Sequence, residues 1–320
     1  MKISKSHLLD GKTISITGSK SISNRLLILG KLFGDLKIEN LSNSQDTQLL
    51  QKALNEDSET VDIHHAGTAM RFLTSFYAIQ EGRKTILTGS ERMKQRPIKP
   101  LVDALRELGA EINYLENEGF PPLEIQGRKI EKNFVKIPAN ISSQFITSLL
   151  LIGASLENGL EIELQGEITS CSYIKMTLKI LKDIGVETYF EGNTIKILSA
   201  ASSLSNQKLD RHYHSSKIKH YTVESDWSSA SYFYSLVAIG KKKMHLKSFY
   251  AHSLQGDSAL KEIYLKFFGV NTISDAGENK ITLLPDIHFQ YPEKFVLDMN
   301  DCPDIAQTVC VTCVALKLPF

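Results

Sequence analysis

The feature that most constrains this chain is an internal repeat, in which a helix pattern closes on a glycine and a strand pattern follows. Three segments end in this way: LVDALRELGAEI, MTLKILKDIGVET and LKEIYLKFFGVNT, with their glycines at Gly109, Gly185 and Gly269. Glycine is the residue expected just past the C-terminus of a helix, where the backbone turns left-handed. The repeat therefore predicts one supersecondary unit that is used several times.

A second shared element lies upstream of each glycine. The stretches HAGTAMRFLTSFYAI, NISSQFITSLLLIGA and SDWSSASYFYSLVAI open with small hydroxylated residues and continue into an apolar helix pattern, as residues that cap a helix do. GSKSISNRLLILGKLF fits the same pattern, and a fifth copy starts at MNDCPDIAQTVCVTCVALKLPF. Because strand patterns such as KTILTG and LEIELQG lie between the helices, the fold class is predicted to be α/β (α+β).

Length and charge bound the class of protein. A chain of 320 residues favours two domains over one compact core. A net charge of +1, with 23% charged and 42% apolar residues, gives no electrostatic bias towards nucleic acid or lipid. No stretch has the apolar core of a signal peptide or the length of a membrane span. We therefore expect a cytoplasmic protein with neither a nucleic-acid nor a membrane partner.

The segment GSKSISNR, residues 18–25, carries groups that bind phosphate but is not a nucleotide P-loop. A serine separates Gly18 from Lys20, and Thr13 stands where the first glycine of a P-loop is required. Each repeat nevertheless places a helix N-terminus after a polar loop, where N–H groups attract anions. Cations such as Lys20 and Arg25 are unfavourable at a helix N-terminus unless an anion is bound. The sequence therefore predicts a local anion site.

The cysteines and histidines are weaker signals. Cys310 and Cys313 have the C-x-x-C spacing of a metal or redox site, but their apolar segment VCVTCVALKL has no second ligand pair and predicts a buried helix. His212, His214 and His220 lie in a polar, basic stretch that favours a solvated loop over a metal site. We expect no metal and no cofactor.

Six motifs occur in one order, and together they resemble the family of 5-enolpyruvylshikimate-3-phosphate (EPSP) synthase, the 3-phosphoshikimate 1-carboxyvinyltransferases. They are GSKSISNR, AGTAMR (66–71), RMKQRPI (92–98), SSQF (142–145), SSASYF (228–233) and PD (303–304). The resemblance implies that the enolpyruvyl group of phosphoenolpyruvate is transferred to the 5-hydroxyl of shikimate 3-phosphate, with release of phosphate. This reaction belongs to the shikimate pathway of aromatic amino-acid biosynthesis and needs no metal or redox cofactor.

The resemblance also implies roles for individual residues. Shikimate 3-phosphate would be bound by Lys20, Ser21, Arg25, Ser142, Ser143, Gln144, Ser170, Tyr173 and Asp304. Phosphoenolpyruvate would be bound by Lys20, Gly67, Thr68, Arg96 and Gln144. Asp304 and Lys20 are the expected catalytic residues, and Asp304 would accept or orient the proton of the 5-hydroxyl. These residue types suit the task, because an arginine binds a carboxylate or phosphate bidentately and a glycine lets an anion approach backbone N–H groups.

The same resemblance implies a two-domain enolpyruvyl transferase fold built from repeated βαβαββ units. One domain is expected at 20–224, with three repeats and most of the shikimate 3-phosphate site. The other is expected at 1–19 plus 225–320, with the strand KTISITG crossing over into it. Because the family continues beyond the position of Phe320, we expect this second domain to be incomplete, with an exposed apolar face around VCVTCVALKLPF. We also expect a monomer with little or no activity.

Departures from the family pattern leave alternatives open. His65 and Phe72 stand where the family has Asn and Pro, and Asp301 and Cys302 also differ. One alternative is the enolpyruvyl transferase that acts on UDP-N-acetylglucosamine, which is disfavoured because Ser21 stands where that family has Asn. The other is a non-catalytic anion-binding protein of the same fold. A binding assay with shikimate 3-phosphate against the UDP-sugar separates the first alternative from the main hypothesis, and turnover excludes the second.

Overall fold

The computed structural model describes residues 7–34, 36–199, 220–294 and 296–319. Contacts divide the chain into two compact units, of which unit 1 consists of Met1–Ser19 and Glu224–Phe320 and unit 2 consists of Lys20–Val223. Within the described residues, no helix has the length and apolar character that crossing a membrane requires.

Unit 2 alternates helices with short strands, as the repeat predicts. Its helices are α1 (Lys20–Phe33), α2 (Gln45–Asn55), α3 (Gly67–Ala78), α4 (Glu91–Lys94), α5 (Lys99–Leu108), α6 (Ser143–Gly153) and α7 (Cys171–Asp183). Its strands are β2 (Lys37–Glu39), β3 (Thr60–Asp62), β4 (Lys84–Thr88), β5 (Glu111–Tyr114), β6 (Leu123–Gln126), β7 (Phe134–Pro138), β8 (Leu160–Gln165), β9 (Thr188–Glu191), β10 (Thr194–Ile197) and β11 (His220–Thr222).

Two four-stranded sheets of unit 2 share one topology. Their strand orders are β3-β4-β6-β5 and β7-β8-β10-β9, and in each the first pair is parallel and the other pairs are antiparallel. Each sheet is therefore one βαβαββ unit. The helices that close these units end as predicted, because Gly109 and Gly185 both have positive φ angles, of 110° and 95°.

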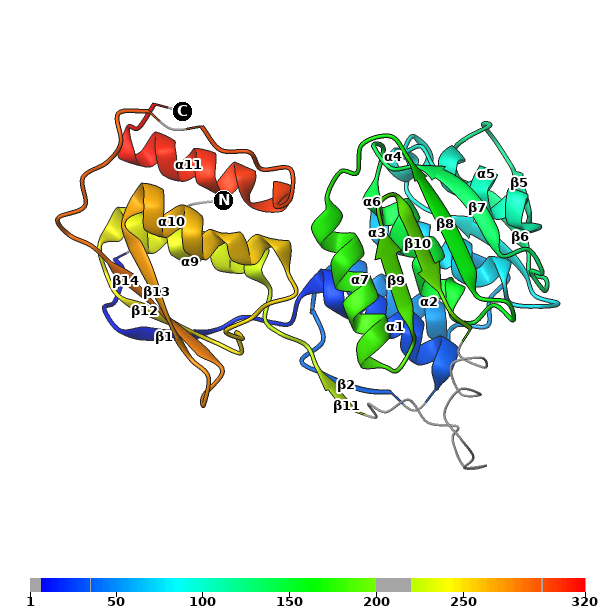
Figure 1. Cartoon of the computed structure of the whole chain (residues 1–320), viewed down its shortest axis with the longest axis horizontal. Helices are drawn as coiled ribbons and strands as arrows, with labels where there is room; N and C mark the ends of the chain where they lie inside the picture. Colours follow the sequence, from blue (N-terminus) through cyan, green and yellow to red (C-terminus); the bar gives the residue numbers. More distant parts are fainter. Residues whose placement is uncertain (1–6, 35, 200–219, 295, 320) are drawn as a thin grey trace. The chain divides into compact units, whose positions relative to one another are not determined.

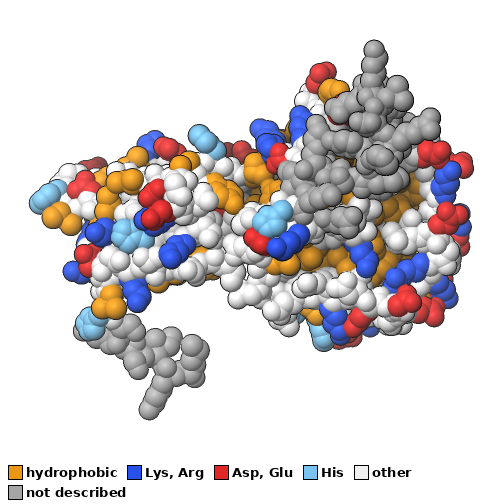
Figure 2. Space-filling model, turned by 90° about the horizontal axis from the view of Figure 1, so that it is seen from below, with side chains coloured by type: hydrophobic (Ala, Val, Ile, Leu, Met, Phe, Trp, Pro, Cys, Tyr) orange, Lys and Arg blue, Asp and Glu red, His pale blue; other side chains and the backbone are white. Residues whose placement is uncertain are grey.

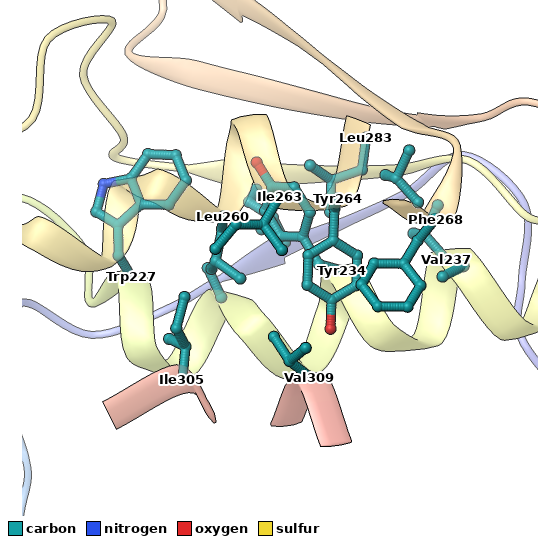
Figure 3. Packing of buried hydrophobic residues seen from close by; sticks show 14 of the residues in the cluster. Trp227, Tyr234, Val237, Leu260, Ile263, Tyr264, Phe268, Leu283, Ile305 and Val309 are labelled. Atoms are coloured by element: carbon teal, nitrogen blue, oxygen red, sulfur yellow. The ribbon is translucent and has the colours of Figure 1, made fainter. Parts of the chain in front are cut away.

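Unit 1 repeats that topology once. Its elements are β1 (Lys12–Ser15), α9 (Trp227–Gly240), β12 (Met244–Lys247), the 3-10 helix η1 (Gly256–Ala259), α10 (Leu260–Phe268), β13 (Val270–Asp275), β14 (Lys280–Pro285), the 3-10 helix η2 (Pro303–Ile305) and α11 (Ala306–Leu316). The sheet order is β1-β12-β14-β13, and α9, α10 and α11 lie on one face of this sheet (Figure 1). Between them is an aromatic core that includes Trp227, Tyr234, Tyr264 and Phe268 (Figure 3).

One strand of each unit lies close to a point where the chain crosses between the units. β1 precedes α1 in the sequence but pairs in parallel with β12 of unit 1, with Lys12 opposite Met244, as predicted for KTISITG. β11 directly precedes unit 1 but pairs in parallel with β2 of unit 2, with His220 opposite Lys37. Each of these strands therefore lies a few residues before a point where the chain passes into the other unit.

Glu224 belongs to unit 1, so the prediction that the other domain extends to residue 224 is wrong by this residue. The side chain is 2% exposed, and its carboxylate accepts hydrogen bonds from the Trp227 indole (2.9 Å), the Gln255 amide (2.9 Å) and the Tyr250 backbone N–H (3.0 Å). Its carbonyl accepts from the Ser19 N–H at 2.8 Å. These partners all lie in unit 1, and a buried carboxylate is stable only where such donors surround it.

Helix α11 confirms the helix predicted for VCVTCVALKL but corrects its burial. Thr312 and Cys313 face the core, whereas Val311 is 60% exposed and Val314 is 69% exposed. The reason is that α11 packs against α9 on one side only, where Ser231 bonds Thr308 (3.0 Å). The apolar face expected around this segment is therefore exposed among the described residues.

Candidate functional site

Helix α1 begins unit 2 and contains KSISNR, the last six residues of the segment GSKSISNR. Lys20 is exposed at the first position of the helix, Ser21 is half-buried, and Arg25 is buried one turn later. The apolar residues Ile22, Leu26 and Leu29 recur on the buried side, so the helix turns Arg25 inwards together with them. The amphipathic pattern therefore places the Arg25 guanidinium in the interior of unit 2.

Arg25 bonds three helices at once. Its Nε–H donates to Thr177 Oγ1 of α7 (2.8 Å), and its Nη1–H donates to the Ser21 carbonyl of α1 (2.7 Å). Its Nη2 donates to Thr147 Oγ1 of α6 (3.3 Å) and to the Tyr173 carbonyl of α7 (3.2 Å). The structure therefore brings Ser21, Arg25 and Tyr173 together, next to the first turn of α6.

The guanidinium of Arg25 is a buried charge among neutral groups. It is 3% exposed, and it lies over the rings of Phe72 and Tyr173, at 5.8 and 5.9 Å from their centroids. Among the residues that the structure describes, no carboxylate is within ion-pair distance of it. Burial lowers the pKa of Arg25 to about 10, because an unpaired cation is disfavoured in a low dielectric.

The N-termini of α6 and α7 carry the other residues predicted to bind shikimate 3-phosphate. Ser142 caps α6, and its hydroxyl accepts from the Gln144 N–H at 3.3 Å. Ser143 is buried in the first turn. Ser170 precedes α7 with a left-handed backbone (φ 52°) and makes no side-chain cap bond. That conformation is uncommon outside glycine and is worth noting at a functional site.

Three of the residues predicted to bind phosphoenolpyruvate, Gly67, Thr68 and Arg96, lie at or against the N-terminus of α3. Gly67 is the first residue of this helix and is buried, Thr68 follows it, and the capping residue Ala66 has no side-chain acceptor for the first turn. The Arg96 guanidinium packs directly on Gly67, because a Cβ atom built on that glycine would lie 2.2 Å from Arg96 Nη1. The structure therefore brings Gly67 and Arg96 together at a helix end that favours anions.

The sequence analysis did not identify Arg71, whose side chain hydrogen-bonds the backbone at the N-terminus of α3 and after α4. Its Nη1 donates to the Gly67 carbonyl (3.0 Å) and its Nη2 to the Pro97 carbonyl (3.2 Å). Burial, together with the nearby charge of Arg96, lowers the pKa of Arg71 to about 10. The signal was in the motif AGTAMR, where an arginine interrupts an otherwise apolar helix. Thr147 and Thr177 were missed in the same way, as lone hydroxyls in apolar helices.

The remaining predicted residues belong to unit 1 or form no site among the described residues. Asp304 is in unit 1, exposed in η2 just before α11. Cys310 is exposed and Cys313 buried, and no cluster of metal-ligating side chains exists among the described residues. His212 and His214 lie outside the described residues, and His220 starts β11, with its Nε2 2.8 Å from Glu39.

The face of the molecule seen in Figure 2 has basic and acidic side chains interspersed. It shows no broad area of positive charge, which is what a nucleic-acid surface requires. On this face, positive charge is therefore not concentrated in one area.

The comparisons with known proteins all match the same enzyme family. The family model described as EPSP synthase (3-phosphoshikimate 1-carboxyvinyltransferase) matches residues 51–319. The 3-phosphoshikimate 1-carboxyvinyltransferase of Bacteroides fragilis (strain YCH46) is 45% identical over 313 residues, covering 96% of this chain and 71% of the relative. That of Haemophilus influenzae (strain ATCC 51907) is 36% identical over 333 residues, covering 94% of this chain and 72% of the relative. A solved structure of EPSP synthase from Acinetobacter baumannii superposes with a TM-score of 0.70 at 18% identity, over 96% of this chain and 72% of that one.

Proposed function

The chain belongs to the EPSP synthase family, the 3-phosphoshikimate 1-carboxyvinyltransferases of the shikimate pathway, and from this we propose which residues of unit 2 hold its two substrates. Shikimate 3-phosphate binds where α1, α6 and α7 begin, around Arg25. Phosphoenolpyruvate binds at the beginning of α3, around Gly67 and Arg96. The alternative family that acts on UDP-N-acetylglucosamine is set aside, because the relatives and the family model are those of EPSP synthase.

One observation carries the shikimate 3-phosphate site: the buried Arg25 guanidinium has only neutral oxygen partners. A guanidinium has five N–H donors, and four hydrogen bonds to Ser21, Thr147, Thr177 and Tyr173 leave one donor on Nη1 for a ligand. A cation held away from water is costly unless an anion joins it. The carboxylate of shikimate 3-phosphate supplies that anion, and the hydroxyls of Ser142, Ser143 and Ser170 are placed at helix N-termini that suit its phosphate.

The phosphoenolpyruvate site depends on Gly67 and Arg96. Gly67 lets the anion reach the N–H groups of the first turn of α3, and Arg96 lies against the same turn. Thr68, Lys20 and Gln144 complete the proposed contacts, and Gln144 serves both substrates. Two phosphorylated carboxylates in one site require this concentration of cations and helix ends.

In the reaction, the 5-hydroxyl oxygen adds to C2 of phosphoenolpyruvate while C3 gains a proton. The tetrahedral adduct then loses a proton from C3 and its phosphate, which leaves EPSP and inorganic phosphate. We assign the proton of the 5-hydroxyl to Asp304, because an ionised carboxylate is a suitable acceptor. Lys20 neutralises negative charge that develops on the reacting substrate. The cytoplasmic location and the monomeric state expected from the sequence stay predictions.

The Arg25→Ala variant tests the site. We expect it to weaken shikimate 3-phosphate binding by about 2–5 kcal/mol in calorimetry, the usual cost of removing one partner of a buried charge pair. Arg83→Ala is the matched control, because Arg83 is paired with Asp57 at the surface, and we expect it to bind normally.

Because a buried arginine also supports the fold, Ser170→Ala provides a second variant with little structural cost. Ser170 makes no cap bond, so its loss is expected to weaken binding while the melting temperature stays unchanged. Unchanged affinity in both Arg25→Ala and Ser170→Ala would remove this site from the function.

A further inference from the structure

A surface pocket of about 560 Å³ lies beside the N-terminus of α3, and its lining contains a group that the proposed function does not use. The lining residues are His65, Arg92, Met93 and Arg96. His65 lies two residues before the start of α3, whereas the other three residues come from α4 and the turn that follows it. The volume is in the range of pockets that hold small molecules. Arg92 therefore shares a pocket with the proposed phosphoenolpyruvate ligand Arg96.

Arg92 and Arg96 differ from the other arginines that the structure describes. Arg25, Arg71, Arg83, Arg106 and Arg128 all donate hydrogen bonds or form ion pairs through their side chains. Arg92 and Arg96 do neither with any described residue. The nearby carboxylates do not reach them, because Glu91 and Glu116 both pair with Lys94, at 3.4 and 2.8 Å.

The two unpaired guanidinium groups stand four residues apart, beside a helix N-terminus that also attracts anions. Like charges at this spacing repel each other, and the positive end of α3 adds to that repulsion. A doubly charged anion reverses the balance, because it interacts favourably with both cations. Arginine is suited to this, since its planar fork binds phosphate bidentately.

We propose that Arg92 is a second phosphate-binding residue for phosphoenolpyruvate, acting with Arg96 from the lining of the same pocket. The ligand class is a phosphate monoester dianion. This inference rests on the proposed phosphoenolpyruvate site. It adds a residue that the motif comparison did not assign, because RMKQRPI was matched only through Arg96.

Calorimetry on the 320-residue chain saturated with shikimate 3-phosphate tests the proposal, with phosphoenolpyruvate and inorganic phosphate as the titrated ligands. Arg92→Ala should weaken both ligands roughly tenfold, the effect of one charge-assisted hydrogen bond. Arg92→Lys should recover part of that loss. Arg128→Ala is the matched control, because Arg128 is paired with Glu111, and it should leave both affinities unchanged.

The outcomes separate this proposal from the function that it rests on. If Arg96→Ala weakens phosphoenolpyruvate binding but Arg92→Ala does not, Arg92 is outside the site and the site itself stands. If Arg92→Ala weakens phosphoenolpyruvate but not inorganic phosphate, Arg92 does not recognise the phosphate and the proposal fails. If neither variant changes binding, or if the unaltered chain binds neither ligand, the phosphoenolpyruvate site is wrong as well. Unchanged shikimate 3-phosphate affinity in every variant would show that the fold is intact.

Discussion

Arg25 and Arg71 are buried, whereas the other arginines that the structure describes are partly or fully exposed. Both are at most 5% exposed, and burial lowers the pKa of each to about 10. Arg71 uses its donors on two carbonyls, so it holds Gly67 and Pro97 in place. Arg25 keeps a donor for a ligand. The motif alone predicted a role for Arg25, but the hydroxyls that support it, Thr147 and Thr177, come from distant helices and carry no local signal.

The cysteines allow a prediction about reactivity. Burial raises the pKa of the Cys302 and Cys313 thiols to about 11, so at pH 8 roughly one thiol in a thousand is the reactive thiolate. Cys310 is exposed on α11. We expect a thiol reagent at pH 8 to modify Cys310 rapidly in the native chain and to modify Cys302 and Cys313 only after denaturation, as peptide mapping can show.

Cys310→Ser is the control for this experiment, because it should abolish the rapid modification on α11 and leave the rest of the pattern unchanged. Rapid modification of Cys313 in the native chain would contradict the burial of that thiol. It would also restore the C-x-x-C pair as a candidate reactive site. The raised pKa has a definite sign: the protection of the buried thiols should weaken only as the pH rises towards 11.

At the scale of single elements, the helix N-termini divide into capped and open ends. Ser142 caps α6, and Asp226 caps α9 by accepting from the Ser229 N–H at 2.7 Å. α3 starts at Gly67, and its capping residue Ala66 makes no side-chain cap bond, although the sequence predicted a capped helix there. An uncapped N-terminus leaves donors to be satisfied by water or by a ligand. The missing cap at α3 is therefore consistent with an anion taking its place.

Gly67 and Gly127 make a matched test of this open end. A Cβ at Gly67 would meet only the flexible tip of Arg96, whereas a Cβ at Gly127 would lie 1.9 Å from the backbone oxygen of Gln80. Gly67→Ala should therefore keep its melting temperature while phosphoenolpyruvate binding weakens roughly tenfold, because Arg96 is displaced. Gly127→Ala should lose about 1–3 kcal/mol of stability through overpacking.

Thermal unfolding and calorimetry on the two variants decide the question. A large fall in melting temperature for Gly67→Ala would mean that the fold requires the glycine. The residue would then give no support to phosphoenolpyruvate binding at α3. Normal phosphoenolpyruvate binding by a stable Gly67→Ala variant would contradict the proposed approach of the ligand to α3.

At the scale of the whole molecule, the sequence predicted the repeat unit and its glycine ends, because both are local patterns. It predicted that β1 joins the other domain only through the resemblance, since no local pattern of KTISITG indicates a strand more than two hundred residues away. The burial of α11 was predicted wrongly for a related reason. An apolar helix pattern shows that a face can be buried, and only the neighbours decide whether it is.

The exposed apolar residues of unit 1 lie on the same helices that carry its core. Tyr232, Leu236 and Ile239 are exposed on α9, and Val311 and Val314 on α11. The corresponding helices α3 and α6 of unit 2 are buried along almost their whole length. Unit 1 contains one sheet of the repeated topology, whereas unit 2 contains two such sheets and the β2-β11 pair. The difference in burial therefore follows from how many repeats surround each helix.

The proposed substrate ligands of the whole molecule lead to a prediction about the activity of the 320-residue polypeptide. The chain spans 71% of the Bacteroides fragilis relative, and among its own residues only Lys20, Arg92 and Arg96 are proposed to offset the charge of phosphoenolpyruvate. The proposed shikimate 3-phosphate site, in contrast, takes all its residues except Asp304 from unit 2. We therefore expect the polypeptide to bind shikimate 3-phosphate nearly as well as the relative does, but to release phosphate from the two substrates far more slowly. One missing transition-state contact typically costs a factor of about 10² to 10³ in rate, so we expect turnover to be at least about a hundredfold lower. A phosphate-release assay on both proteins at equal concentration, with calorimetry for binding, measures the two quantities separately. Equal turnover would show that the residues present here suffice for phosphoenolpyruvate, and weak binding of shikimate 3-phosphate would show that unit 2 alone does not form its site.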